Sequence, residues 1–168
     1  MKIKSEIIEI INDLVSVSDA RAHLRIEDTS EDAEISVCVD SAFSYVENML
    51  GYMIAPRRYN MEITEYAAGE EIPLPGYSVQ IDAAETAAGD PAEFTLHYGV
   101  LSFPAAGDYN IQLTAAPRPL TDRRHIVQAL LMLTAKFFEQ RGDDTKADTE
   151  GCWDTVDRLL NLVRRVSL

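Results

Sequence analysis

The apolar positions of the first 55 residues follow a helical spacing in three successive segments. We expect a short helix from 19 to about 25, because Ser18 is a good N-cap residue before an acidic first turn. The segment 35–50 predicts a helix of about five turns, and Gly51 stands where a left-handed C-cap residue belongs. A helix is also predicted over 3–15, because helical spacing relates Ile3, Ile7, Ile10, Ile11 and Leu14. The isoleucine content of this segment leaves a strand as the alternative.

An acidic break, IEDTSED at 26–32, separates the second of these segments from the third and holds four carboxylates in seven residues. It is either a metal or catalytic site or a helix-capping turn. Asp28, Thr29 and Ser30 are all N-cap types, and Thr29 with Asp32 or Ser30 with Ala33 would place a capping oxygen at the start of the long helix. Carboxylates in its first turn are stabilised by the helix dipole by about 0.3–1 kcal/mol each. Since capping accounts for every residue, we predict a cap and no site.

The pattern changes at Pro56, after which short apolar segments are broken by Gly and Pro as far as residue 116. In YNIQLTA, for example, Tyr109, Ile111 and Leu113 alternate with polar residues, which is typical of a half-buried strand. Turn-rich stretches between these segments favour hairpins. We therefore predict a small antiparallel β insertion at about 57–116.

Helical spacing returns after Pro117 and Pro119. A helix capped by Thr121 or Asp122 is predicted to run to about Arg141, with a narrow polar stripe formed by His125, Gln128, Lys136 and Glu139. A helix this apolar must be covered, either by the protein's own core or by a neighbouring subunit. A last helix carrying Trp153 follows the acidic loop 142–151.

These elements predict an α+β fold with a mainly helical body. We expect one domain spanning 1–168, with helices over 1–55, the β insertion over 56–117 and two C-terminal helices over 118–168. A chain of this length can bury roughly 70% of its unfolded surface in one core.

The net charge of −13, from 28 acidic and 15 basic residues, is the outlying feature of the composition. Such a surface repels phosphate backbones, which argues against general nucleic-acid binding. It fits either a solubilising surface or one that lies near DNA without adhering to it. Charged residues interrupt the N-terminal apolar positions, so we expect no signal peptide. Cys38 and Cys152 are expected to be free thiols in a reducing cytoplasm.

Candidate chemistry is sparse along the chain. His23, His97 and His125 lack partners at metal-ligand spacing. Cys38 lies within a predicted helix with nothing nearby to lower its pKa, and the loop 142–151 lacks the spacing of a calcium-binding loop. We therefore predict no catalytic, cofactor-binding or metal-binding residues.

Three stretches resemble the head–tail connector family of tailed phages, whose members are also called adaptor or head-completion proteins. VSDARAHLRIEDTSEDAEISVCVDSAFSYVENMLGYMI resembles the family's N-terminal signature, in which an acidic stretch and a long helix follow a His-Leu-Arg turn. YNIQLTAAPRPLTDRRHIVQALLMLTAKFFEQRGD resembles its last strand, proline-bearing turn and apolar helix, and EIPLPGYSVQID its Leu-Pro strand pair. The sequence departs at TAAPRPL, where family members commonly carry a Gly, and in its more acidic final loop.

The resemblance implies a structural virion protein of the phage neck, made in the cytoplasm of a bacterial host. It implies a ring of about twelve copies beneath the portal protein, extending the DNA channel and presenting a platform to a stopper or tail-completion protein. DNA would pass through without specific binding, and no enzyme activity, cofactor or membrane is implied. The alternatives are another neck or tail-completion protein, or a small soluble enzyme.

Three sets of residues are candidates for assembly. The C-terminal helix is the candidate for portal docking, because aromatic and Arg residues anchor interfaces, through Trp153, Leu159, Leu160, Arg164 and Arg165. Trp153 is equally well explained as a core residue. The apolar helix offers a candidate subunit interface at Ile126, Leu130, Phe137 and Phe138. A candidate acidic channel surface comprises Glu31, Asp32, Glu34, Asp143 and Asp144.

Overall fold

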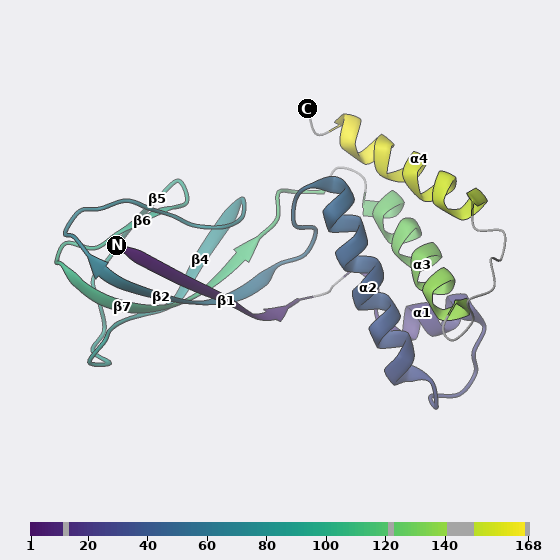
Figure 1. Cartoon of the computed structure of the whole chain (residues 1–168), viewed down its shortest axis with the longest axis horizontal. Helices are drawn as coiled ribbons and strands as arrows, with labels where there is room; N and C mark the ends of the chain where they lie inside the picture. The colour runs from purple at the N-terminus through teal and green to yellow at the C-terminus, as the bar shows by residue number, and fades with distance from the viewer. Residues whose placement is uncertain (12–13, 121–122, 141–149, 167–168) are drawn as a thin grey trace. The chain divides into compact units, whose positions relative to one another are not determined.

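The computed structural model describes residues 1–11, 14–120, 123–140 and 150–166 of the chain. The chain forms two compact units. The sheet unit comprises 1–11 and 54–118, and the helical unit comprises 12–53 and 119–168. Figure 1 shows strands in the first and helices in the second. The predicted α+β class is confirmed, but the strands make up a substantial share of the described chain, so a mainly helical body is not.

The sheet unit contains two antiparallel sheets. The larger sheet has the strand order β1-β2-β7-β4, and the smaller has the order β3-β6-β5. The strands are β1 (Lys2–Ile10), β2 (Arg57–Tyr66), β3 (Ile72–Pro73), β4 (Ser78–Thr86), β5 (Thr95–His97), β6 (Val100–Ser102) and β7 (Gly107–Ala116).

One face of the larger sheet forms the core of this unit. Tyr109, Ile111 and Leu113 of β7 are all buried, as their alternation predicts. They lie directly opposite residues of β2 that are also buried, namely Ile63, Met61 and Tyr59. The predicted antiparallel β insertion is therefore confirmed.

Tyr66 joins the larger sheet to the segment that follows β6. Its hydroxyl donates to the Glu70 carbonyl at 2.7 Å and accepts the backbone N–H of Phe103 at 2.9 Å. Its ring meets the rings of Phe103 and Tyr109 edge-on. The rings of Phe103 and Tyr109 stack on each other, with their centroids 3.8 Å apart. Because Tyr66 and Phe103 are almost fully buried, no water can replace the hydroxyl.

Tyr66→Phe should therefore destabilise the protein by about 1–3 kcal/mol, the cost of leaving a buried N–H without an acceptor. Urea unfolding measures this difference. Tyr77→Phe is the matched control, because the Tyr77 side chain is 73% exposed and its hydroxyl can be replaced by water. Equal stability of the two variants would contradict the role given to Tyr66.

The predicted helix over 3–15 is wrong, because residues 2–10 form strand β1. β1 pairs antiparallel with β2, placing Ile3 opposite Ile63 and Ile7 opposite Tyr59. Isoleucine is β-branched and favours strands over helices. The pairing partner lies some fifty residues along the chain, beyond the reach of a local pattern.

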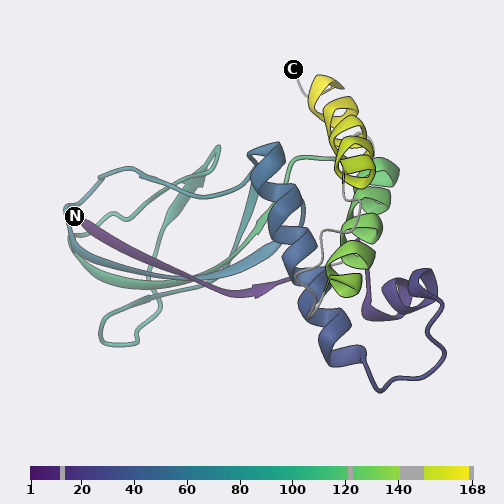
Figure 2. The ribbon, with the colours of Figure 1, turned by 45° about the vertical axis from the view of Figure 1, so that its right-hand side comes forward.

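The helical unit contains α1 (Val17–Leu24), α2 (Asp32–Leu50), α3 (Arg123–Glu139) and α4 (Glu150–Val166). α3 packs against α1, α2 and α4, and Figure 2 shows α3 between α2 and α4. α2 buries Ile35, Val39 and Val46 on one face. It ends at Gly51, whose φ of 76° confirms the predicted left-handed cap.

The N-terminal caps differ from those predicted. Ser16, not Ser18, caps α1, and it forms a capping box with Asp19. α2 begins at Asp32 with no capping hydrogen bond from a side chain, so capping by Thr29 or Ser30 is wrong. Instead the Asp28 carboxylate accepts the backbone N–H of Ser30 at 2.9 Å, which closes a turn just before the helix. The predicted caps of α3 lie outside the described residues.

Ser16→Ala should destabilise the helical unit by about 1 kcal/mol at neutral pH, the usual effect of losing an N-cap. Hydrogen bonds from Ser16 lower the pKa of Asp19. This contribution is therefore complete above the unfolded pKa of about 3.9 and is lost as pH falls through the folded pKa. Urea unfolding at several pH values should show the difference from the unmodified protein shrinking in acid. Ser18→Ala, at an exposed position that forms no cap, should leave the stability unchanged at every pH.

Candidate assembly surfaces

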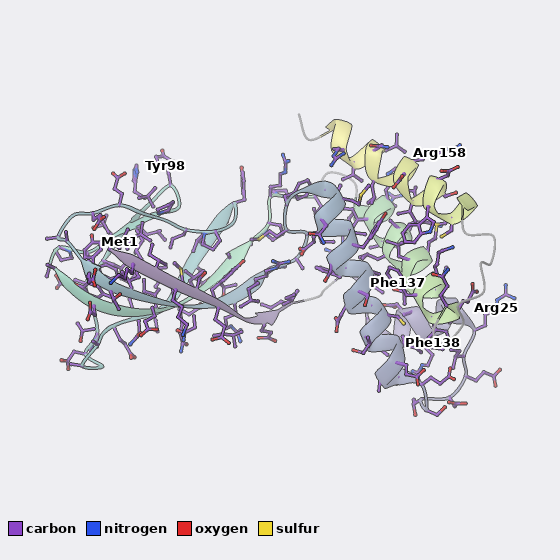
Figure 3. All side chains as sticks on the ribbon, in the orientation of Figure 1. Met1, Arg25, Tyr98, Phe137, Phe138 and Arg158 are labelled. Carbon is purple, nitrogen blue, oxygen red and sulfur yellow. The ribbon has the colours of Figure 1, made fainter. Side chains whose placement is uncertain are left out.

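The apolar residues of α4 lie on one face of the helix and pack against the rest of the helical unit. Val156, Leu160 and Val163 are at most 3% exposed. Arg164 reaches the carbonyl of Met49 at the end of α2 with a guanidinium N–H. On the outer side, Leu162 is 48% exposed, and Arg158 projects from α4 on the side away from α3 (Figure 3).

Trp153 holds the first turns of α4 to the two neighbouring helices. Its ring lies 5.1 Å from that of Tyr45 on α2 and 6.3 Å from that of Phe137 on α3. The ammonium group of Lys136, itself buried, stands 5.6 Å above the indole ring. Trp153 and Leu160 thus anchor α4 from within, while Leu159 is half-buried and Arg164 is exposed. The side chain of Arg165 lies outside the described part of the chain.

Trp153→Ala should release α4 from the helical unit, because it removes the aromatic contacts and leaves Lys136 buried without its ring partner. Large-to-small substitutions at aromatic core positions cost about 3–5 kcal/mol, and the partial exposure of Trp153 places the expected loss at the lower end. Hydrogen exchange should become faster in α4 than in the strands of the sheet unit. Leu162→Ala is the control on the exposed side of the same helix. Equal protection of α4 in both variants would contradict the anchor role.

The candidate interface residues of α3 fall into two groups. Ile126 and Leu130 are fully buried and belong to the core of the helical unit. Phe137 and Phe138 are half-buried, so both keep surface that a neighbouring subunit can contact. The sequence left two possible covers for α3, the protein's own core and a neighbouring subunit. The protein's own helices supply most of the cover.

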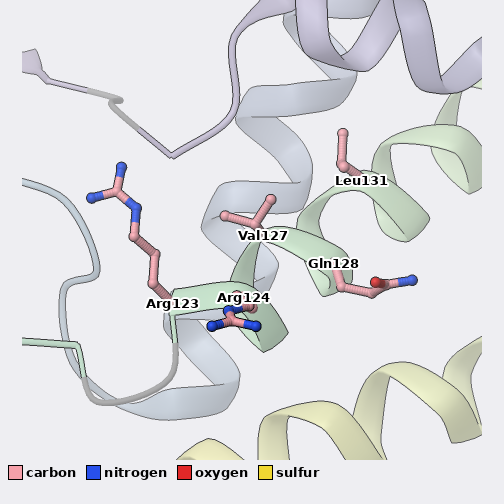
Figure 4. A pocket seen from close by; sticks show the side chains of 5 residues that line it. All are labelled: Arg123, Arg124, Val127, Gln128 and Leu131. Atoms are coloured by element: carbon pink, nitrogen blue, oxygen red, sulfur yellow. The ribbon is translucent and has the colours of Figure 1, made fainter.

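A groove runs along the start of α3 on the side that the other helices leave open (Figure 4). Arg123 and Arg124 lie at one end of it, and Val127, Gln128 and Leu131 continue along the helix. It combines guanidinium groups with apolar side chains, in a chain whose net charge is strongly negative.

The acidic residues at the start of α2 form a charged surface rather than a binding pocket. The Asp32 carboxylate lies 3.6 Å from the Arg21 guanidinium group. Glu31 is half-buried and Glu34 is exposed. Hydrogen bonds from Ser30 lower the pKa of Asp28, which keeps that carboxylate ionised. Asp143 and Asp144, the other two candidates for the channel surface, lie outside the described residues.

The described residues contain no cluster of His, Cys, Asp or Glu side chains able to hold a metal ion. Cys38 and Cys152 are free thiols, as predicted. Burial raises the pKa of Cys38, so the thiol stays protonated at neutral pH. None of the described helices is long and apolar enough to cross a membrane.

Two features of the surface escaped the sequence analysis. The isoleucines of β1 are exposed. Tyr98 is 94% exposed at the tip of the β5–β6 hairpin (Figure 3). Its φ of 50° and that of Gly99, 76°, are both positive, as in the tight turns of two-residue hairpins. The Tyr-Gly pair between two short apolar runs was the available signal for this turn.

The family of phage gp6-like head-tail connector proteins has a model that matches residues 14–75 of this chain. The match spans α1, the acidic break, α2 and the first strands after it. It includes the stretch that carries the resemblance in the sequence.

The fold is similar to that of chains in solved neck structures of a gene transfer agent (GTA) particle. A chain in the neck of the empty particle, computed with C6 symmetry, is 20% identical, with 95% of each chain covered and a TM-score of 0.58. A chain in the neck of the native particle, computed with C12 symmetry, is 21% identical, covers 95% of this chain and 94% of its own length, and has a TM-score of 0.56. The virion of the native particle holds a chain with a TM-score of 0.54 at 21% identity and 95% coverage of both. No curated protein matches the sequence.

These comparisons confirm the resemblance to head–tail connector proteins that the sequence predicts. The segment that matches the family model builds α1 and α2, and the similarity of fold extends over nearly the whole chain.

Proposed function

We propose that this protein is a structural component of the neck of a tailed phage or phage-like particle, where it joins the head to the tail. The observation that carries the proposal is the coincidence of two matches. The head–tail connector family model matches residues 14–75, and the fold over 95% of the chain is similar to that of a chain in a solved neck structure. The sheet and helical units act together as one connector domain. The protein has no catalytic role and needs no cofactor.

In this role, copies of the chain form a closed ring of about twelve subunits with heterologous contacts. The similar neck chains belong to particles computed with C6 and C12 symmetry, which supports a ring. Phe137 and Phe138 contribute from α3 to contacts between subunits, because their rings are only half covered within the subunit.

The outer side of α4 is our candidate for the surface that docks on the portal protein. Trp153 and Leu160 fix the helix from beneath, which leaves Leu159, Leu162 and Arg164 at or near the surface. A stopper or tail-completion protein binds the opposite side of the ring.

The charge of the chain suits a passage for DNA. Phosphate contacts from Lys and Arg would hold the duplex by counterion release, whereas a net charge of −13 opposes such contacts. Glu31, Asp32 and Glu34 at the start of α2 are the candidates for a surface past which DNA slides. DNA is thus cargo in transit and not a bound ligand.

Removal of the gene from an inducible phage that encodes this protein tests the proposal. Electron microscopy of the lysate should show heads without tails, containing DNA or having lost it, together with free tails. The gene supplied from a plasmid should restore tailed particles. Normal infectious particles from the deletion strain would contradict the proposal, and intact tailed particles without infectivity would favour an enzymatic role after assembly.

A further inference from the structure

We propose that the two open edges of the larger sheet pair with each other between neighbouring copies, so that β1 of one copy adds to β4 of the next. The inference builds on the proposed function only in taking a ring of identical copies as the assembly. It names the surfaces that close that ring.

β1 is an edge strand that leaves apolar side chains uncovered. Ile3, Ile7 and Ile10 are 42%, 45% and 44% exposed. Their register places them opposite alternate residues of β2, on the face that is buried further into the sheet. An edge strand with an apolar row and an unpaired row of backbone groups is a template for adding another strand, unless the protein blocks it.

β4 forms the other edge and carries a matching row. Val79 and Ile81 lie opposite Ala115 and Leu113 on the same buried face, and both are only half-buried. The segment 90–92 covers the far end of β4 through two backbone hydrogen bonds. The Thr86 N–H donates to the Asp90 carbonyl at 2.8 Å, and the Ala92 N–H donates to the Ala84 carbonyl at 2.9 Å. The part of the edge left open is 78–82.

Strand direction makes the two edges compatible in a ring. Direction alternates through β1, β2, β7 and β4, because each neighbouring pair is antiparallel. A second copy in the same orientation therefore brings its β1 antiparallel to β4 of the first copy. The apolar rows of the two copies then fall on the same face of one continuous sheet. Unlike a β1–β1 pairing, which would close at two copies, this contact is heterologous and can close a ring.

Charge on the opposite face selects the same pairing. Lys4 points to the polar face of β1, opposite Glu62 of β2. Asp82 of β4 lies on that face too, where its carboxylate accepts the Thr114 hydroxyl at 2.7 Å. With Lys4 of one copy opposite Asp82 of the next, Ile7 comes opposite Val79. One pair of opposite charges and one apolar pair thus agree on this register.

Cysteine cross-linking tests this register. Lys4→Cys and Asp82→Cys are combined in a Cys152→Ser background, with the buried Cys38 retained, and the gene is supplied to the deletion strain. Opposed residues of an antiparallel pair lie about 4.5–5.5 Å apart at Cα, within disulfide range. Mild oxidation of purified tailed particles should give a ladder of covalent multimers on a non-reducing gel. Each single-cysteine variant should remain monomeric, and dimers from Lys4→Cys alone would indicate β1–β1 pairing and overturn the proposal.

Charge reversal provides a second, independent measurement. Lys4→Glu and Asp82→Lys should each reduce the yield of tailed particles, and the double variant should restore it. Circular dichroism of each purified variant checks that it still folds, so that a lower yield reports on pairing between copies. Tailed particles that form normally in both single variants, with no cross-linked ladder, would overturn the edge pairing while the proposed function stands. Normal tailed particles from the deletion strain without any supplied gene would instead contradict the proposed function itself.

Discussion

The helical unit is built by covering α3. This helix carries apolar residues around most of its circumference, and Ile126, Ala129, Leu130 and Leu133 are fully buried. The neighbouring helices α1, α2 and α4 shield most of this surface. Burying these side chains is the main source of stability, at about 25 cal/mol per Å² of apolar surface. The position of α4 follows from it, because α4 covers the side that α1 and α2 leave open. A C-terminal helix held in this way presents its remaining side chains outward in a fixed arrangement.

The sheet unit meets a different constraint, since an open sheet always has two edges. One face of the larger sheet is buried through β2 and β7, but the apolar rows continue onto β1 and β4 where cover is incomplete. Burial therefore stops short of the edges. A protein that works as a closed ring can leave this surface for its neighbours to cover. The helical unit buries its core within one copy, whereas the sheet unit leaves apolar side chains of β1 exposed at its edge.

Local patterns predicted the elements whose cause is local. The alternation around Ile111 and the glycine after α2 specified a strand and a helix end, because strand pleat and left-handed capping act over a few residues. The apolar spacing of α3 predicted its cover without deciding which segments supply it. β1 was misread because pairing with β2 determines its structure, and isoleucines at irregular spacing fit either period. Ser16 was missed in favour of Ser18, since only the observed start of α1 distinguishes two good caps. The half-exposed edge residues were beyond prediction, because exposure at an edge depends on strand order.

We propose above that this chain is a ring-forming connector between head and tail. The most direct measurement is a cryo-electron microscopy reconstruction of the neck of the particle that carries it, at a resolution sufficient to trace strands. We expect a closed ring of this fold between head and tail, with α4 turned toward the portal protein and β1 of each copy beside β4 of the next. A neck in which no density accommodates the two units would contradict it.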